Sequence, residues 1–277
     1  MEAKPQHPAI AMTIAGSDSS GGAGIQADLK TFTALGVYGA SVITALTAQN
    51  TRGVTAVELA SPAFVAAQIK AVLDDLDVAA IKTGMLAASA LVESIAAELS
   101  NYPLIPLIVD PVMVATSGDR LIDDDAVDAV KRLIFPRALL ITPNLPEAAR
   151  LLDSAIATTE SEAGKQLEGL ARLGAKAVLL KGGHGSGGEA VDLLWHAGRI
   201  TRLASSRIDT KNTHGTGCTL SAAIAALIAS GASTEAAVTR GKAYVHAAIS
   251  SARDLRIGKG HGPVDHLYAI RRTSPAV

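Results

Sequence analysis

The stretch IAMTIAGSDSSGGAGIQADLK, residues 10–30, decides the fold class of this chain. Its first six residues are apolar or small and predict a buried strand. The glycines that follow predict a tight turn, and the rest predicts a helix from about Gly24 to Leu35. A strand, a turn and a helix in this order form the repeating unit of a parallel sheet covered by helices.

The same alternation continues along the chain. Further strands are expected at residues 41–46, 54–59, 79–85, 104–109, 138–142 and 177–180. Ser61 and Pro62 begin one helix as its N-cap and first-turn proline, and two late helices are expected over residues 217–230 and 235–253. Residues 191–208 alternate as an antiparallel edge hairpin does. We therefore expect an α/β fold with a mostly parallel central sheet, helices on both faces and an antiparallel edge hairpin.

Composition limits the function classes. Of the 277 residues, 48% are apolar and only 3% aromatic, so aliphatic side chains must fill the core. The net charge of −1 and the lack of a basic run argue against nucleic-acid and membrane-surface binding. A single cysteine, with no apolar run of transmembrane length, favours a cytoplasmic protein. We expect residues 1–8 to be a disordered lead-in and residues 9–277 to form one domain.

The first glycine-rich segment, Gly16 to Gly24, follows a strand and enters a helix. It does not match a phosphate-binding P-loop, because neither Gly21 nor Gly22 is followed by the lysine of that motif. Residues 22–27 match the dinucleotide pattern G-x-G-x-x-A, but no acidic residue follows about 20 positions later at a strand end. A dinucleotide oxidoreductase is therefore rejected, and a tight turn with close helix–strand packing remains an equally good interpretation.

The second glycine-rich segment, Thr213 to Cys218, precedes a strongly apolar helix. Backbone N–H groups at a helix N-terminus, together with its partial positive charge, favour an anion such as a transferring phosphoryl group. Cys218 would lie in the first helical turn, where we expect the pKa of its thiol to be lowered. The alternative is a glycine-rich cap with a small buried cysteine.

Charged and polar residues follow three other expected strands. Asp110 comes directly after one strand, and Lys181 ends another. Asn144 and Glu147 follow a third strand and are one helical turn apart, although Asn and Glu at this spacing also form a capping box. Because the carboxyl ends of parallel strands meet at one edge of a sheet, these residues together predict a phosphate and metal site.

Several segments together resemble the hydroxymethylpyrimidine and phosphomethylpyrimidine kinases of the ribokinase superfamily. These segments are residues 13–18, 21–30, 44–51, 82–86, 142–148, 181–184, 211–221 and 260–264. The resemblance implies a ribokinase-like fold, ATP as co-substrate with Mg²⁺, and a homodimer. It also implies phosphorylation of 4-amino-5-hydroxymethyl-2-methylpyrimidine to its monophosphate and then to its diphosphate, in thiamine diphosphate biosynthesis.

The resemblance also implies a role for individual residues. The pyrimidine pocket would be formed by Gly16, Asp28, Gln49, Met85 and Val112. ATP would contact Asn144, Lys181, Thr213 and Thr216, with Asp110 and Glu147 near the metal. Cys218 would take the proton from the substrate hydroxyl, while Lys181, Gly215 and Gly217 would stabilise the transferring phosphoryl group.

Two other functions stay open. One is a pyridoxine or pyridoxal kinase of the same fold, alone or as a second activity. Some of these kinases resemble this chain in having cysteine where it has Cys218. The other is a non-catalytic vitamin-binding or regulatory protein, against which Glu147, Lys181 and Cys218 argue. All of these functions require a small-molecule ligand and neither nucleic acid nor a membrane.

Overall fold

The computed structural model describes residues 8–113, 122–183 and 187–273. All but the last residue of the expected lead-in, and His184 of the resemblance segment 181–184, lie outside these described ranges.

An eight-stranded sheet forms the centre of the molecule, in the order β10-β9-β8-β7-β6-β5-β1-β2. Its strands are β1 (Ile10–Ala15), β2 (Tyr38–Ile43), β5 (Val78–Thr83), β6 (Leu107–Val109), β7 (Leu140–Ile141), β8 (Ala177–Lys181), β9 (Glu189–His196) and β10 (Arg199–Ser206). Every pairing from β8 to β2 is parallel, whereas β9 and β10 pair antiparallel at one edge. The expected fold class and its edge hairpin are confirmed.

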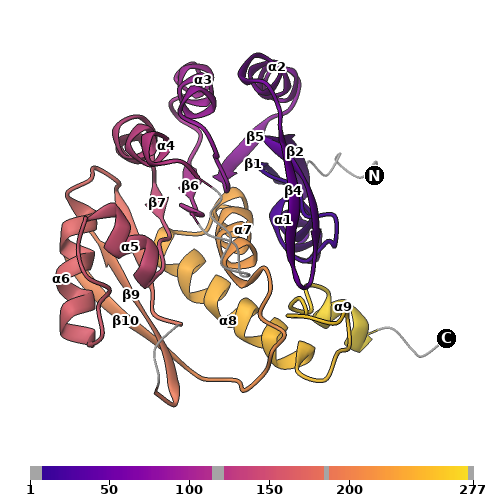
Figure 1. The fold of residues 1–277 in the computed structure, drawn as a ribbon, viewed down its shortest axis with the longest axis vertical. Coiled ribbons are helices and arrows are strands. Elements are labelled where there is room, and N and C mark those ends of the chain that lie inside the picture. Colours follow the sequence, from indigo (N-terminus) through magenta and orange to yellow (C-terminus); the bar gives the residue numbers. More distant parts are fainter. Residues whose placement is uncertain (1–7, 114–121, 184–186, 274–277) are drawn as a thin grey trace, which may run out of the picture.

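Helices cover both faces of this sheet (Figure 1). One core lies between the sheet and α1 (Gly24–Ala34), α7 (Thr216–Ala229) and α8 (Thr234–Ala252), with α9 (Tyr268–Thr273) at its border. The other core lies beneath α2 (Pro62–Leu73), α3 (Ser89–Leu99), α4 (Asp124–Ala129), α5 (Leu145–Leu151) and α6 (Glu160–Ala171). A π-helical turn (Val130–Ile134) and a 3-10 turn (Phe135–Arg137) follow α4. No helix in the described ranges is long and apolar enough to cross a membrane.

The strand expected at residues 41–46 is wrong as a single element. The chain leaves the main sheet at Thr44, after the end of β2. The buried hydroxyl of Thr44 donates to the carbonyl oxygen of Met85 (2.9 Å). The chain then forms β3 (Ala45–Asn50), which pairs antiparallel with β4 (Gly53–Leu59) in a separate two-stranded sheet. Apolar periodicity is the same on both sides of Thr44, so the sequence pattern did not reveal the break.

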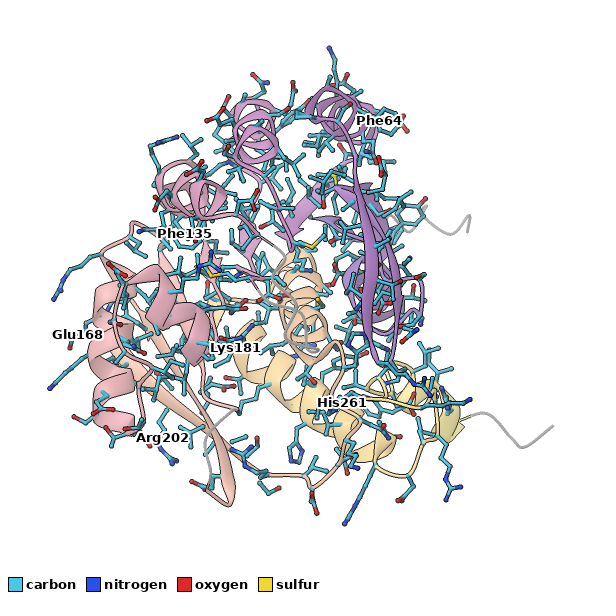
Figure 2. The ribbon with its side chains drawn as sticks, in the orientation of Figure 1. Phe64, Phe135, Glu168, Lys181, Arg202 and His261 are labelled. Carbon is cyan, nitrogen blue, oxygen red and sulfur yellow. The ribbon has the colours of Figure 1, made fainter. Side chains whose placement is uncertain are left out.

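Phe32→Ala should destabilise the fold strongly, because Phe32 of α1 has no exposed surface and fills the core beside α7. Removing a fully buried aromatic ring costs about 3–5 kcal/mol. Phe64→Ala is the matched control: this ring lies at the rim of the molecule on α2 and is 62% exposed, so its loss should cost less than about 0.5 kcal/mol (Figure 2). Urea unfolding of both variants measures the difference, and equal losses would contradict the assignment of the core.

Candidate active site

A cavity of about 660 Å³ lies between the carboxyl edge of the sheet and the N-terminus of α7. Its lining includes the predicted site residues Gly16, Gln49, Met85, Asp110, Val112, Asn144, Glu147, Lys181, Thr213, Gly215, Thr216, Gly217 and Cys218. Asp28 is the exception among the predicted site residues, because it does not line the cavity. The cavity thus joins segments from nearly the whole length of the chain.

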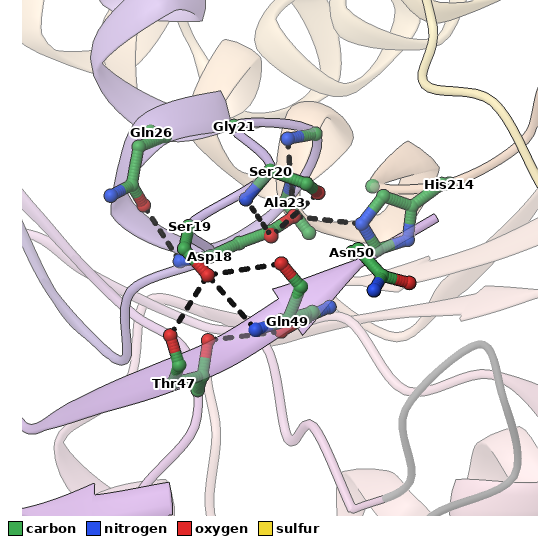
Figure 3. Close-up of polar contacts among 12 residues, drawn as sticks. Asp18, Ser19, Ser20, Gly21, Ala23, Gln26, Thr47, Gln49, Asn50 and His214 are labelled. Carbon is green, nitrogen blue, oxygen red and sulfur yellow. Dashed lines mark hydrogen bonds and ion pairs between the residues drawn. The ribbon is translucent and has the colours of Figure 1, made fainter. Parts of the chain in front are cut away.

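The first glycine-rich turn is organised by the carboxylate of Asp18 (Figure 3). One carboxylate oxygen accepts bonds from the backbone N–H (2.8 Å) and the hydroxyl (2.7 Å) of Ser20. The other accepts from the backbone N–H groups of Gly22 (3.1 Å) and Ala23 (2.8 Å). Since the chain's own carboxylate occupies these N–H groups, this turn is a structural turn and not a phosphate loop.

Asp18 also joins this turn to the second glycine-rich turn. Its Oδ2 lies 2.8 Å from Nε2 of His214, which is 196 positions further along the chain, and both side chains are buried. Burial would raise the pKa of Asp18, but hydrogen bonds from His214 and Ser20 hold it well below its ordinary value. The turns touch so closely that a Cβ atom on Gly215 would overlap the carbonyl oxygen of Gly22. The two turns therefore form one rigid wall of the cavity.

Strand β3 completes this wall. The backbone N–H of Gln49 donates to the Ser19 hydroxyl (2.9 Å) (Figure 3). The Thr47 hydroxyl donates to the Ser17 carbonyl oxygen (2.9 Å). The side-chain oxygen of Gln49 accepts a longer bond from Thr47 (3.3 Å). These contacts place the amide of Gln49, which can both donate and accept, at the cavity.

The start of α7 provides free backbone donors. Gly215 is its N-cap and has φ of +78°, a conformation that glycine adopts readily. In the described part of the chain, the N–H groups of Gly217 and Cys218 have no hydrogen-bond partner, as is usual for a first helical turn. Gly217 also has Lys181 beside it, since a Cβ there would lie 3.3 Å from Nζ of that lysine. Two backbone donors and one ammonium thus point to an anion site.

Asp110 and Lys181 form an ion pair beside this anion site (2.8 Å). The Asp110 carboxylate also accepts hydroxyl bonds from Thr142 (3.1 Å) and Ser221 (3.3 Å). Burial opposes its ionisation, but the ammonium groups of Lys181 and Lys82 lower the pKa of Asp110 overall. Asp110 is therefore a carboxylate at neutral pH.

Asn144 and Glu147 form a true capping box at the start of α5. Each side chain accepts a bond from the backbone N–H of the other residue (2.8 Å in both cases). Burial raises the pKa of Glu147 to about 7. The charge of Lys181 acts to lower this pKa, and the nearby Asp110 carboxylate acts to raise it. In the ranges that the structure describes, no cluster of three or more metal-ligating side chains is present.

The expectation of a lowered pKa for Cys218 is wrong. Burial raises the pKa of this thiol to about 11, although Lys82 and the backbone N–H of Gly24 act in the opposite direction. The helix terminus that we took as the dominant influence is outweighed because the sulfur is desolvated. Neighbours that sequence spacing does not reveal therefore decide its protonation state.

Lys82 is a site residue that sequence reasoning missed. It lines the cavity, and its Nζ lies 2.8 Å from Oδ2 of Asp28, with no exposed surface on either side chain. Thr13 donates to the same carboxylate oxygen (2.6 Å). Asp28 thus lies beneath Lys82 and bonds to it, which is why it does not reach the cavity. A lysine in the otherwise apolar strand 79–85 was the available signal.

The far end of the cavity was also missed. It is lined by Val245, His246 and Ile249 of α8 and by residues 205–208, which are the last two residues of β10 and the two that follow it. Lys242 bonds to Asp192 here (2.6 Å), and the same carboxylate accepts the backbone N–H of Gly182 (3.0 Å). This end combines apolar and polar groups from elements that show no motif in the sequence.

Three comparisons place the chain among known proteins. A family described as Phosphomethylpyrimidine kinase matches residues 18–265. The hydroxymethylpyrimidine/phosphomethylpyrimidine kinase of Rhizobium meliloti (strain 1021) is 58% identical over 260 residues, which are 94% of this chain and 97% of that protein. An ADP complex of Bacillus subtilis pyridoxal kinase has a TM-score of 0.88 at 34% identity, covering 97% and 100% of the two chains. The phosphomethylpyrimidine kinase of Clostridium difficile 630 has a TM-score of 0.75 at 42% identity, covering 86% and 97%.

Asp18→Asn should destabilise the protein by about 1–3 kcal/mol at pH 7, because buried N–H groups and His214 lose a charged acceptor. The folded-state pKa of Asp18 lies below its ordinary value, so its stabilisation is fully present above about pH 4. It is lost as the pH falls further, and the difference between wild type and variant should shrink there. Denaturant midpoints between pH 3 and 7 measure this. Asp128→Asn, at an exposed ion pair, is the control and should show no such trend.

Proposed function

Because the chain belongs to the phosphomethylpyrimidine kinase family, we propose that it phosphorylates 4-amino-5-hydroxymethyl-2-methylpyrimidine and then the resulting monophosphate. ATP is the phosphoryl donor, and the diphosphate product serves thiamine diphosphate biosynthesis. One observation carries the proposal: a single cavity joins the free N–H groups of Gly217 and Cys218 to a polar amide, that of Gln49.

The two substrates occupy opposite ends of this cavity. The pyrimidine ring lies against Gly16, Gln49, Met85 and Val112, where the Gln49 amide pairs with the aminopyrimidine edge. The ATP phosphates lie near the residues that line the middle of the cavity, Asn144, Lys181, Thr213 and Thr216. The apolar surface of Val245 and Ile249 holds the adenine ring. This arrangement places the γ-phosphoryl group at the start of α7.

Mg²⁺ is the expected metal, and the residues present suit it. The buried carboxyl groups of Asp110 and Glu147 lie close enough for one to raise the pKa of the other, and a divalent cation would relieve that repulsion. Mg²⁺ commonly uses one or two carboxylates together with phosphate oxygens and water. When bound, the ion would offset negative charge on the ATP phosphates.

The remaining chemistry comes from the chain itself. The Cys218 thiolate takes the proton from the substrate hydroxyl, whose oxygen bonds to the γ-phosphorus. The bond from that phosphorus to the bridging oxygen breaks, and ADP leaves. The N–H groups of Gly217 and Cys218 and the Lys181 ammonium stabilise charge on the transferring group. Positioning and electrostatics carry most of the catalysis in phosphoryl transfer. The second phosphorylation starts from an ionised phosphate and needs little help from a base.

A kinase acting on pyridoxal is the second candidate, favoured by the similarity of this fold to Bacillus subtilis pyridoxal kinase. Release of ADP measured side by side with the hydroxymethylpyrimidine, its monophosphate and pyridoxal distinguishes the two. Turnover of pyridoxal alone would overturn the main proposal. Turnover of none of the three would revive a non-catalytic binding protein.

We also propose that residues 9–277 act as one domain, and that the chain works as a homodimer in the cytoplasm. The shared central sheet supports the first statement. Exposed apolar side chains on the small β3–β4 sheet, Leu46, Val57 and Leu59, offer a surface that a second copy would cover. The single cysteine is consistent with a reducing compartment. Sedimentation equilibrium gives the number of chains directly.

Cys218→Ala should lower phosphorylation of the alcohol by about 10²–10⁴ and phosphorylation of the monophosphate much less. Burial raises the pKa of Cys218 to about 11, so the thiolate fraction in the wild type grows as the pH rises. The alcohol reaction should therefore accelerate by up to about tenfold per unit between pH 7 and 10, and the variant should lose this dependence. Steady-state rates with both acceptors measure it. Equal losses in both steps would mean that Cys218 shapes the pocket and transfers no proton.

A further inference from the structure

Residues 260–264 carry one of the segments that resemble the kinase family, yet they do not line the cavity. They belong to a connecting segment, residues 258–264, which runs between α8 and α9. Figure 1 shows this yellow stretch of chain meeting the end of the hairpin that contains β4. The connecting segment therefore reaches the site through the elements that it contacts.

The first half of the connecting segment is bonded to Thr51, the residue that follows β3. The side-chain oxygen of Thr51 accepts from the backbone N–H groups of Lys259 (3.2 Å) and Gly260 (3.0 Å). Its carbonyl oxygen accepts from the N–H of His261 (2.9 Å). The approach is so close that a Cβ atom on Gly260 would overlap this carbonyl oxygen. One threonine thus receives three bonds from residues that lie 208 positions or more further along the chain.

The second half of the connecting segment is bonded to the turn that precedes α7. The N–H of His214 donates to the carbonyl oxygen of Gly262 (3.0 Å), and the N–H of Val264 donates to the carbonyl oxygen of His214 (3.4 Å). His214 and Pro263 form a parallel β-bridge, and residues 262–264 are buried. Gly215, the N-cap of α7, comes directly after His214. This half is therefore fixed beside the anion site.

The connecting segment ties together two parts of the cavity wall that serve different substrates. Gln49 lies two positions before Thr51, and its backbone N–H is held by the hydroxyl of Ser19 (2.9 Å). The second attachment, at Thr51, prevents the end of β3 from turning about that contact. Misplacing a reacting group by about 1 Å can cost as much as a hundredfold in rate. A fixed distance between Gln49 and the start of α7 is thus valuable to a kinase.

We propose that Thr51 is a positioning residue for the pyrimidine, and that residues 258–264 fix it relative to the phosphoryl site. The inference rests on the proposed function, in which the Gln49 amide pairs with the pyrimidine. Thr51 does not line the cavity, so it acts through the strand that carries Gln49. The alcohol and the monophosphate share one ring, so the proposal requires that both acceptors depend on Thr51 equally. ATP binding at the other end does not depend on it.

Thr51→Val tests the proposal, because it keeps the shape of the side chain and removes the oxygen that accepts two bonds. KM for the alcohol and KM for the monophosphate should both rise about three- to tenfold, which corresponds to about one hydrogen bond. KM for ATP should stay unchanged, and kcat should change less than the acceptor KM. Thr51→Ser keeps the oxygen and should restore values close to those of the wild type. Steady-state ADP release measures all of these constants.

Two further variants complete the test. Gly260→Ala pushes the connecting segment away from Thr51 and should raise the same two acceptor KM values. Thr55→Val is the matched control, since its hydroxyl donates within the same hairpin, to the carbonyl oxygen of Ala48 (2.9 Å). It should leave every KM unchanged. Thermal melting checks that each variant is folded, and if either Thr51→Val or Gly260→Ala is unfolded, the other decides.

Unchanged acceptor KM values in the folded variants overturn the proposal. So does an equal rise in KM for ATP, which would mean that these bonds serve only the stability of the fold. Failure of the proposed function has a different signature, because the wild type then releases no ADP with either pyrimidine. Calorimetry of pyrimidine binding without ATP still decides in that case: weaker binding by Thr51→Val supports the positioning role, and equal binding or none by the wild type overturns it.

Discussion

Parallel pairing of the strands from β8 to β2 is the constraint on which the site depends. It directs the carboxyl ends of these strands to one edge, so Lys82, Asp110 and Lys181 lie around one space although β5, β6 and β8 are far apart in sequence. The buried helix α7 presents its N-terminus to the same space and supplies the free N–H groups. Without parallel order, these groups would be divided between opposite edges of the sheet.

Contacts across the cavity convert this convergence into a defined site. The Asp18–His214 pair holds the first glycine-rich turn against the second, which leads into the first turn of α7. Charge is balanced inside: Lys82 bonds to Asp28, and Lys181 bonds to Asp110. Such balance makes burial tolerable, but the partial burial of Cys218 still raises the pKa of its thiol. At neutral pH this thiol is therefore protonated.

Several elements could be predicted because their signals are local. The strand–turn–helix at residues 10–34, the edge hairpin and the last two long helices all follow from periodicity and turn residues. The capping box of Asn144 and Glu147 was readable from spacing alone, and it is formed. The break at Thr44 was not readable, because the contacts made there, such as the hydroxyl bond to the Met85 carbonyl oxygen, are with residues distant in sequence. For Asp28, the sequence could not show that a lysine 54 positions away covers it.

The sequence by itself determined the fold class, the family and the identity of the residues that gather at the sheet edge, because these depend on local patterns and on motifs read in order. Only the tertiary structure decided what those residues do to one another. It filled the first glycine-rich turn with the Asp18 carboxylate, placed Lys82 between Asp28 and the cavity, and raised the pKa of Cys218. Protonation states and hydrogen-bond partners depend on desolvation and on distances between segments that are remote in sequence, and these quantities exist only once the chain has folded.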